Sequence, residues 1–163
     1  MSGGKLSCAW RFLLLGLSAV LVLLDQLSKS WARESLHLFQ ARAFMPHWNW
    51  TLMYNDGAAF SFLASQNGWQ KIVFSLFAGL VACAIVYYLL RKTYSRMVGI
   101  AFALILSGAV GNLVDRMRMG KVTDFIDWFL GSYHWPAFNL ADSCITLGVT
   151  LLIIDSIFCA KKL

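Results

Sequence analysis

Charged residues are scarce in this sequence. They account for 13% of its 163 residues, whereas apolar residues account for 59%. Soluble globular domains carry about 25% charged residues. The low charge therefore excludes an ordinary soluble domain, and the composition is typical of a protein embedded in a membrane.

Paired cysteines and metal-ligand spacings are also lacking. The 4 cysteines show no paired spacing, and Cys83, Cys144 and Cys159 lie inside apolar stretches. The 3 histidines are scattered outside these stretches. Disulfide frameworks and zinc sites both need regular spacings of these residues. The sequence therefore predicts neither a disulfide nor a metal site.

Long apolar stretches dominate what is present. They cover residues of about 12–31, 72–90, 97–114 and 140–160. The second and third contain no charged residue, and each is long enough to cross about 30 Å of hydrocarbon as a helix. The first and fourth contain Asp25, Lys29, Asp142 and Asp155, and such intramembrane charges point to a function or a partner. We expect an all-α integral membrane protein with four transmembrane helices, forming a single membrane domain of residues 1–163.

The first stretch is interpreted as a retained span. Asp25, Gln26 and Lys29 follow its uncharged part, residues 12–24, at the place where a signal peptide would have a small-residue cleavage site. Unmixed basic residues then mark the inner face: Lys5, Arg11, Arg91, Lys92, Arg96, Lys161 and Lys162. By the positive-inside rule both termini are cytoplasmic, with outer-face segments at about 32–70 and 115–138. The net charge of +6 thus reflects topology and does not indicate a nucleic-acid partner.

A small extracytoplasmic β element is expected in the first outer segment. Large side chains alternate along 50–54, the sequence Asn-Asp-Gly follows at 55–57, and apolar residues resume at 58–62. This pattern predicts a strand, a tight turn and a second strand. Most of the 7 tryptophans fall on or beside the outer face, where amphipathic rings favour lipid headgroups. We expect the element to rest on membrane lipid.

Consecutive spans cross the membrane in opposite directions, and this alternation brings the polar residues to one face. The ends of spans one and three, the start of span four and both outer segments must share a side of the membrane. Asp25 and Lys29 are four residues apart on a helix and can pair. Gly108, Asn112 and Arg116 follow the same spacing and share a helix face. These side chains therefore converge toward a common site.

Five segments carry a family pattern: DQLSK at 25–29, NDGAAFS at 55–61, GAVGNLVDR at 108–116, VTDFID at 122–127 and FNLADSCI at 138–145. In this order and spacing they resemble the bacterial lipoprotein signal peptidases, also called signal peptidase II. The segments extend over nearly the whole chain. Ser107 stands where a glycine is common, a difference expected to affect only helix packing.

The resemblance implies an aspartyl endopeptidase of the bacterial cytoplasmic (inner) membrane. It implies that Asp124 and Asp142 are the catalytic pair, and the charge distribution predicts that they lie near the outer face. The positions that map onto substrate binding or support of the pair are Asn55, Gly108, Asn112, Arg116, Asn139 and Ala141. Asp25, Lys29 and Asp115 are expected to be structural polar residues.

The resemblance also implies a substrate and a reaction. Family members cut prolipoproteins just before a cysteine that carries a diacylglyceryl group. Two carboxylates in a poorly solvated site do not both ionise easily, so they hold one proton between them. The ionised partner would take a proton from the attacking water, and the protonated one would polarise the carbonyl and later protonate the amine. The sequence leaves open which aspartate holds the proton; we expect no cofactor and a monomer.

A small channel or transporter is the alternative, with the polar residues lining an ion route. Against it, these residues cluster at one face, and Asp155 alone lies toward the other. Other membrane proteases are excluded because the chain contains no His-Glu-x-x-His, Gly-x-Gly-Asp or Gly-x-Ser-x-Gly motif.

Overall fold

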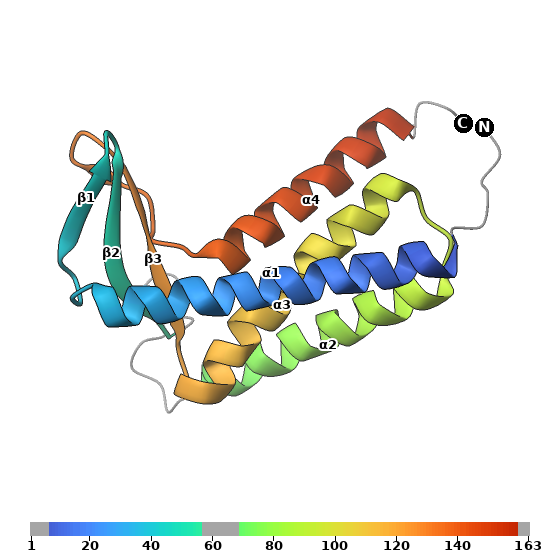
Figure 1. The fold of residues 1–163 in the computed structure, drawn as a ribbon, viewed down its shortest axis with the longest axis horizontal. Helices are drawn as coiled ribbons and strands as arrows, with labels where there is room; N and C mark the ends of the chain where they lie inside the picture. Colours follow the sequence, from blue (N-terminus) through green and yellow to red (C-terminus); the bar gives the residue numbers. More distant parts are fainter. Residues whose placement is uncertain (1–6, 57–68, 160–163) are drawn as a thin grey trace.

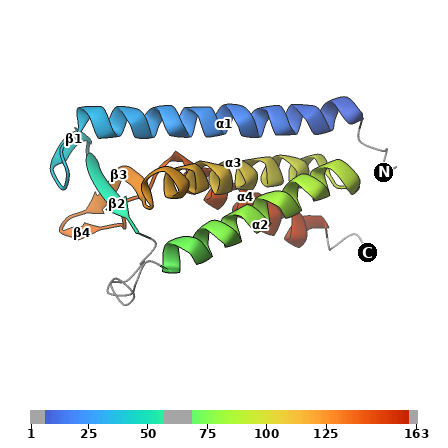
Figure 2. The same cartoon turned by 90° about the horizontal axis from the view of Figure 1, so that it is seen from below.

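The computed structural model describes residues 7–56 and 69–159. The element order is α1 (Cys8–Ser35), β1 (Ala41–Met45), β2 (Trp48–Asn55), α2 (Trp69–Arg91), α3 (Arg96–Met119), β3 (Val122–Leu130), β4 (Tyr133–His134) and α4 (Leu140–Cys159). Each of the four helices contains a stretch long and apolar enough to cross a membrane. The helices run alongside one another and the sheet stands at one end of them (Figures 1 and 2). The expected fold class is confirmed.

Short capping signals set two helix starts and one helix end. The Ser7 hydroxyl accepts the backbone N–H of Trp10 at 3.2 Å, and α1 begins there. The Ser95 hydroxyl accepts the N–H of Val98 at 3.1 Å at the start of α3. Side-chain oxygens at these positions satisfy backbone donors that the helix leaves open. Gly120, with φ of 77°, ends α3 in the left-handed conformation that glycine adopts without steric cost.

Helix α3 is the centre of the bundle and packs against the other three helices. Its buried face is rich in small residues, which let neighbouring helices approach closely. At Gly108 the approach is closest, because a Cβ atom there would collide with the Ala141 carbonyl and the Ile145 side chain. Glycine at this position therefore allows the start of α4 to lie directly against α3.

The outer surfaces of α1, α2 and α4 are apolar. Large side chains such as Phe12, Leu80 and Phe158 are more than half exposed, as expected for helices that contact lipid. At the end away from the sheet, Arg11 donates to the backbone carbonyls of Leu89 at 2.8 Å and Lys92 at 2.9 Å. These bonds tie the start of α1 to the connection between α2 and α3.

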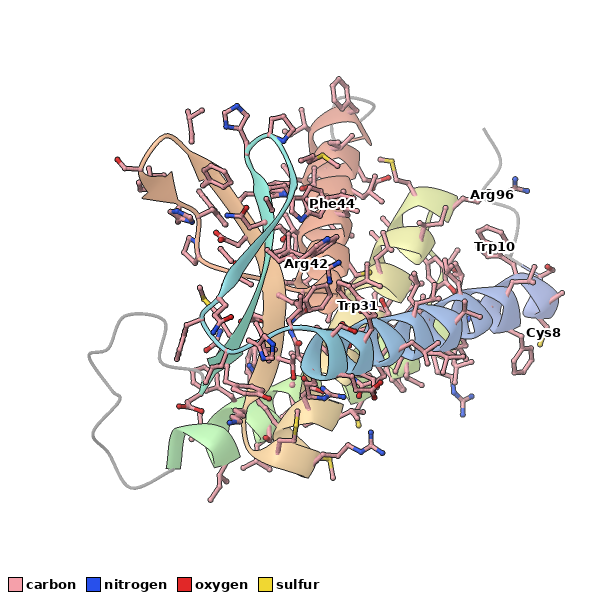
Figure 3. The ribbon with its side chains drawn as sticks, turned by 60° about the vertical axis from the view of Figure 1, so that its left-hand side comes forward. Cys8, Trp10, Trp31, Arg42, Phe44 and Arg96 are labelled. Carbon is pink, nitrogen blue, oxygen red and sulfur yellow. The ribbon has the colours of Figure 1, made fainter. Side chains whose placement is uncertain are left out.

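The four strands form an antiparallel sheet in the order β1-β2-β3-β4. Aromatic rings fasten this sheet to the end of α1. The Trp50 ring centroid lies 5.5 Å from that of Trp31 on α1 and 5.0 Å from that of Phe44 on β1. Figure 3 shows Trp31 and Phe44 at this end, and Trp10 and Arg96 at the opposite end of the helices. The sheet is thereby held over the site described below.

Three details refine the sequence expectations. The strand predicted at 50–54 is confirmed as part of β2, whereas the strand predicted at 58–62 lies outside the described residues. Strands β1, β3 and β4 were not predicted. Buried and exposed residues do not alternate along β1, which is exposed throughout, or along the first six residues of β3, which are all buried. Strand β4 has only 2 residues. Helix α3 extends to Met119 and takes up the first residues expected in the second outer segment.

Candidate active site

Asp124 and Asp142 come from a strand of the sheet and from the helix that starts beside it. Asp124 lies in β3, opposite Met53 of β2, and is 3% exposed. Asp142 lies in the first turn of α4 and is partly buried. The chain before α4 is pinned to β3 because Ile126 and Phe138 exchange backbone hydrogen bonds of 2.9 and 3.1 Å. This pairing fixes the start of α4 beside Asp124.

Asn139 connects the two carboxylates. Its side-chain Nδ2 donates to Asp124 Oδ1 at 2.7 Å. Its backbone N–H donates to Asp142 Oδ2 at 3.2 Å, and its Oδ1 accepts the backbone N–H of Asp142 at 3.0 Å. The last two bonds form a reciprocal cap at the start of the helix. One buried residue therefore positions both aspartates.

Asn112 supports Asp142 from α3. Its Nδ2 donates to Asp142 Oδ1 at 2.7 Å. Its Oδ1 accepts Lys29 Nζ at 2.9 Å and Asn139 Nδ2 at 3.2 Å. Lys29 is completely buried. The two asparagines and Lys29 thus form a continuous hydrogen-bonded chain behind the aspartates.

The Lys29 ammonium is compensated by two carboxylates. Its Nζ lies 2.9 Å from Asp25 Oδ2 and 3.6 Å from Asp115 Oδ2. Asp25 also accepts the backbone N–H of Ala141 at 2.9 Å, and Asp115 accepts that of Thr123 at 2.9 Å. These bonds satisfy the buried charges and join α1 and α3 to the segments that carry the two site aspartates.

The remaining predicted positions border this network. Asn55, at the end of β2, has a side-chain hydrogen bond to Asp124. Arg116 is half-buried, interacts electrostatically with Asp124 and Asp142, and lies over the Phe74 ring at 5.8 Å. The structure thus brings all the predicted site residues to one end of the bundle. Asp155 lies at the other end, where its Oδ1 accepts the Ser95 hydroxyl at 2.9 Å.

Burial sets the protonation of Asp124. Burial, followed by the nearby charge of Asp142, raises the pKa of Asp124 from 3.8 to about 7, against the opposing hydrogen bonds from Asn139 and Asn55. Two carboxyl groups in one poorly solvated site favour a state with a single shared proton. The arrangement can therefore supply a base and an acid at the same time near neutral pH.

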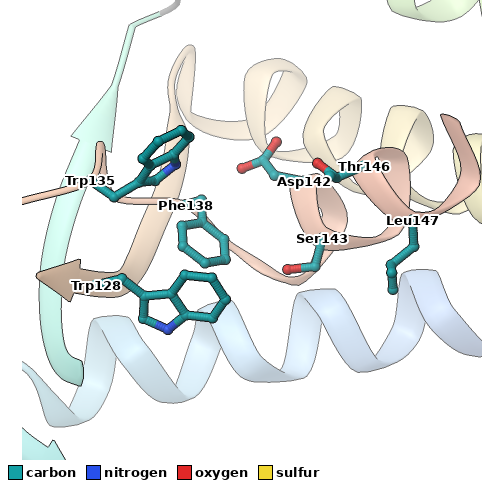
Figure 4. Close-up of a pocket in the computed structure, with 7 residues that line it drawn as sticks. All are labelled: Trp128, Trp135, Phe138, Asp142, Ser143, Thr146 and Leu147. Atoms are coloured by element: carbon teal, nitrogen blue, oxygen red, sulfur yellow. The ribbon is translucent and has the colours of Figure 1, made fainter. Parts of the chain in front are cut away.

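An apolar cavity of about 560 Å³ opens beside the pair. Its walls are Trp128, Trp135, Phe138, Asp142, Ser143, Thr146 and Leu147. In Figure 4 the aromatic rings stand opposite the first turns of α4, with Asp142 at the border of the cavity. The Asp142 carboxylate thus borders a space suited to an apolar chain.

Several residues of the site were missed by sequence reasoning. Thr123 contributes its carbonyl to Asn139 at 3.2 Å, Gln26 donates to the Gly111 carbonyl at 3.1 Å, and Arg33 donates to the Thr123 hydroxyl at 3.0 Å. Thr123 lies on a strand, so no helical spacing marks it. Gln26 and Arg33 share a face of α1 with Lys29, three residues before it and four after it, but only the pair of Asp25 and Lys29 was predicted there. A signal existed for the cap, because Asn139 and Asp142 are three residues apart at the start of an apolar stretch.

A separate polar cluster lies on the sheet. Asp127 is 3% exposed and accepts hydrogen bonds from Thr51 at 3.0 Å and Asn49 at 3.4 Å. Its other oxygen lies 2.7 Å from His134 Nδ1. Burial raises the pKa of Asp127, but the hydrogen bonds from His134, Thr51 and Asn49 outweigh burial and lower it overall. Within the described residues no group of three or more metal-binding side chains occurs.

The sequence matches a known protein family and several of its members. The family model described as signal peptidase (SPase) II matches residues 17–158. A lipoprotein signal peptidase of Acinetobacter baumannii is 48% identical over 149 residues, covering 91% of this chain and 85% of the relative. One of Burkholderia mallei is 45% identical over 157 residues, covering 96% and 91%.

Solved structures agree with these matches. A bacterial membrane enzyme determined by the in meso method at 2.3 Å resolution superposes with a TM-score of 0.82 and 29% identity, covering 97% of this chain and 93% of that one. A second, at 1.9 Å, gives a TM-score of 0.79 at 29% identity, with 94% and 96% covered. The likeness therefore includes the sheet as well as the helices.

Proposed function

Since this chain belongs to the signal peptidase II family and cleaves signal peptides from prolipoproteins, we propose that Asp124 and Asp142 are the catalytic dyad of that reaction. The observation that carries the proposal is the shared hydrogen-bond network. Asn139 donates to both carboxylates, at 2.7 and 3.2 Å. Pairing of a buried and a partly buried carboxylate through one residue is the arrangement that an acid and a base acting on one bond require.

The dyad activates water without a further group. The ionised carboxylate removes a proton from a water molecule, whose oxygen attacks the scissile carbonyl carbon. The protonated carboxyl donates a hydrogen bond to the carbonyl oxygen, which gains negative charge, and then gives its proton to the leaving amine. Arg116, which interacts electrostatically with both aspartates, stabilises negative charge at the site.

The substrate is a prolipoprotein in which the cysteine after the scissile bond carries a diacylglyceryl group. The cavity beside Asp142 is apolar and bordered by Trp128 and Leu147. Apolar residues of the signal peptide fit this space, which lies along the first turns of α4. The lipid chains remain in the bilayer, and the substrate helix enters sideways between lipid and protein. This placement accounts for a hydrolase embedded among apolar helices.

The orientation follows from the charges at the other end. Arg96 lies there, on the opposite side of the bundle from the sheet (Figure 3). Arg11 lies at the same end, because it donates to the carbonyls of Leu89 and Lys92. The positive-inside rule places this end in the cytoplasm and the dyad near the outer face of the inner membrane. We infer that the protein acts as a monomer, and the described network, which joins both aspartates within one chain, supports this.

Cleavage of a defined substrate tests this function. Purified protein in lipid is incubated with a diacylglyceryl-modified prolipoprotein, and both products are identified by mass spectrometry. We expect a free signal peptide and a mature chain that begins at the modified cysteine. The same prolipoprotein without the lipid group is the control and should be cut at least tenfold more slowly. Equal cleavage of both forms would contradict the proposed substrate, and cleavage at another bond would contradict the proposed site.

A further inference from the structure

The donors around Asp142 favour its ionised form. Asp142 Oδ1 accepts the Asn112 amide at 2.7 Å, and Oδ2 accepts the Asn139 backbone N–H at 3.2 Å. Both of its oxygens therefore act as acceptors. Asp142 also lies in the first turn of α4, where the helix dipole favours negative charge. A proton on either oxygen would make that oxygen a weaker acceptor for one of these donors.

The orientation of both asparagine amides is fixed by groups of known polarity. Lys29 Nζ can only donate, so it holds Asn112 Oδ1 at 2.9 Å and turns Asn112 Nδ2 toward Asp142. The Asp142 N–H holds Asn139 Oδ1 at 3.0 Å, and the Thr123 carbonyl accepts Asn139 Nδ2 at 3.2 Å. Neither amide can be reversed without placing two donors or two acceptors together.

Asp124 lies in a different environment. It projects from a strand, so no helix dipole acts on it directly, and it is 3% exposed. Its Oδ1 accepts Asn139 Nδ2 at 2.7 Å, and its side chain has a second hydrogen bond with Asn55. These partners are side chains, whereas Asp142 also accepts a backbone N–H at the start of a helix. The raised pKa of Asp124, which burial causes first and Asp142 second, agrees with retention of a proton on this carboxyl. The two aspartates are therefore not equivalent.

We propose that Asp142 is the ionised partner and base of the dyad, that Asp124 carries its proton, and that Lys29 is a positioning residue which fixes this asymmetry through the Asn112 amide. This assignment rests on the proposed dyad. It decides a question that the sequence leaves open, and it gives the buried Lys29 a role beyond pairing the helices.

The assignment defines the proton transfers. Asp142 takes a proton from water, the water oxygen forms a bond to the carbonyl carbon, and Asp124 donates a hydrogen bond to the carbonyl oxygen. Asp124 then transfers its proton to the amide nitrogen as the carbon–nitrogen bond breaks, which releases a carboxylic acid and an amine. The proton on Asp142 passes to Asp124, and the dyad returns to its starting state.

Charged groups from every packed element face this pair. Helix α1 contributes Asp25 and Lys29, whose charges act on Asp142, and Lys29 also acts on Asp124. Helix α3 contributes Arg116 and, behind the pair, Asp115. The Lys29 ammonium has two carboxylate neighbours and donates to Asn112. The Lys29 hydrogen bond thus orients the Asn112 amide toward Asp142, while the Lys29 charge is largely balanced by the two carboxylates.

Infrared difference spectra test where the proton lies. Wild type, Asp124→Asn and Asp142→Asn are compared at about pH 6, below the pKa of about 7 of Asp124. The C=O stretching band of a protonated carboxyl should disappear in Asp124→Asn and remain in Asp142→Asn. The reverse pattern, or the same result in both variants, overturns the assignment. The proposed dyad is tested separately, by loss of peptide cleavage in both variants.

Lys29→Met tests the positioning residue. We expect kcat to fall at least tenfold with KM within about twofold, because substrate contacts are unchanged. Loss of the ammonium leaves the negative charges of Asp25 and Asp115 uncompensated. These charges make the anionic form of the dyad less stable, so the acidic limb of the kcat profile should move to higher pH. If Lys29→Met does not fold, the charge-balanced Asp25→Asn/Lys29→Met variant is used.

Ser18→Ala is the control for a merely structural effect. In wild type the Ser18 hydroxyl donates to the Ala103 carbonyl at 2.9 Å, which is another buried contact between α1 and α3. This variant should lose stability without a change in the kcat profile. A folded Lys29 variant whose kcat and pH profile match those of Ser18→Ala overturns the positioning role, whereas a displaced acidic limb in the Lys29 variant alone supports it.

Discussion

Asn139 and Asp142 cap each other at the start of α4. The Asn139 side-chain oxygen accepts the Asp142 N–H at 3.0 Å, and the Asp142 carboxylate accepts the Asn139 N–H at 3.2 Å. The Asn139 amide nitrogen then extends to Asp124 at 2.7 Å. A helix cap is thus also the element that sets the geometry of the proposed dyad, so stability and activity should respond together when it is changed.

Asn139→Ala should lower kcat about 100-fold, within the range that general acid–base catalysis contributes. The substitution removes the bond to Asp124 and half of the cap, so both carboxylates lose their fixed positions. Steady-state kinetics on a lipidated prolipoprotein measure the effect. Asn49→Ala is the control, since it removes an amide hydrogen bond to Asp127 outside the site. Similar kcat losses in the two variants would show that Asn139 has no special role.

Asp124→Asn should be more stable than wild type at high pH. The folded state binds the Asp124 proton more tightly than the unfolded state does, because the pKa is raised from 3.8 to about 7. Wild type therefore loses free energy of unfolding between about pH 4 and 7, and the asparagine variant does not. At pH 8 its Tm should exceed that of wild type by at least about 3 °C, given about 2–4 °C per kcal/mol at this size.

Asp127→Asn is the matched opposite case. Hydrogen bonds lower the pKa of Asp127, so its ionised form stabilises the fold above the unfolded pKa and that stability is lost as pH falls through the folded pKa. At neutral pH this variant should have a lower Tm than wild type. Thermal unfolding at several pH values measures both variants. Parallel pH dependence of Asp124→Asn and wild type would refute the account of Asp124.

Gly108→Ala should loosen the contact between α3 and α4. The added Cβ would meet the Ala141 carbonyl, which is backbone and cannot move alone. Overpacking of this kind costs about 1–3 kcal/mol, and the shift of α4 displaces Asp142, so Tm and kcat should both fall. Gly16→Ala on α1 is the control, because nothing lies within 4 Å of its added Cβ. If both variants behave alike, close packing at Gly108 does not position the site.

Thr146→Trp should fill the cavity beside Asp142. Thr146 is exposed, lines the cavity and lies one helical turn after Asp142. A large ring there should lower kcat/KM at least tenfold, about 1.4 kcal/mol, with little change in Tm. Thr150→Trp, one turn further along α4 and also exposed, is the control. Unchanged kcat/KM in Thr146→Trp would separate the cavity from substrate binding.

Helix-level features of this protein could be predicted from its sequence. The lengths of the apolar stretches predicted the four membrane-spanning helices. The four-residue spacing of Asp25 and Lys29 indicated the ion pair that the structure shows at 2.9 Å. Both features depend on local periodicity along one helix. Chain parity then indicated that the polar residues share one end of the bundle, as the structure shows.

The sheet and the details of the site could not be predicted in the same way. The first six residues of β3 are all buried, because α1, α3 and β2 cover it, so no alternation was present in the sequence. The hydrogen bond from Arg33 to Thr123 joins residues that are 90 positions apart, and the one from Asn139 to Thr123 joins residues 16 positions apart. Such contacts follow from the packing of the helices, which cannot be derived from a single sequence.

Peptide cleavage by two isosteric variants tests the central claim most directly. Asp124→Asn, Asp142→Asn and the control Asp155→Asn, an aspartate of α4 at the opposite end of the bundle, are purified and incubated with diacylglyceryl-modified prolipoprotein. Mass spectrometry measures the released signal peptide. We predict no detectable product from the first two variants and nearly wild-type conversion by the third. Full conversion by folded Asp124→Asn or Asp142→Asn would contradict the assignment of these two carboxylates as the catalytic dyad.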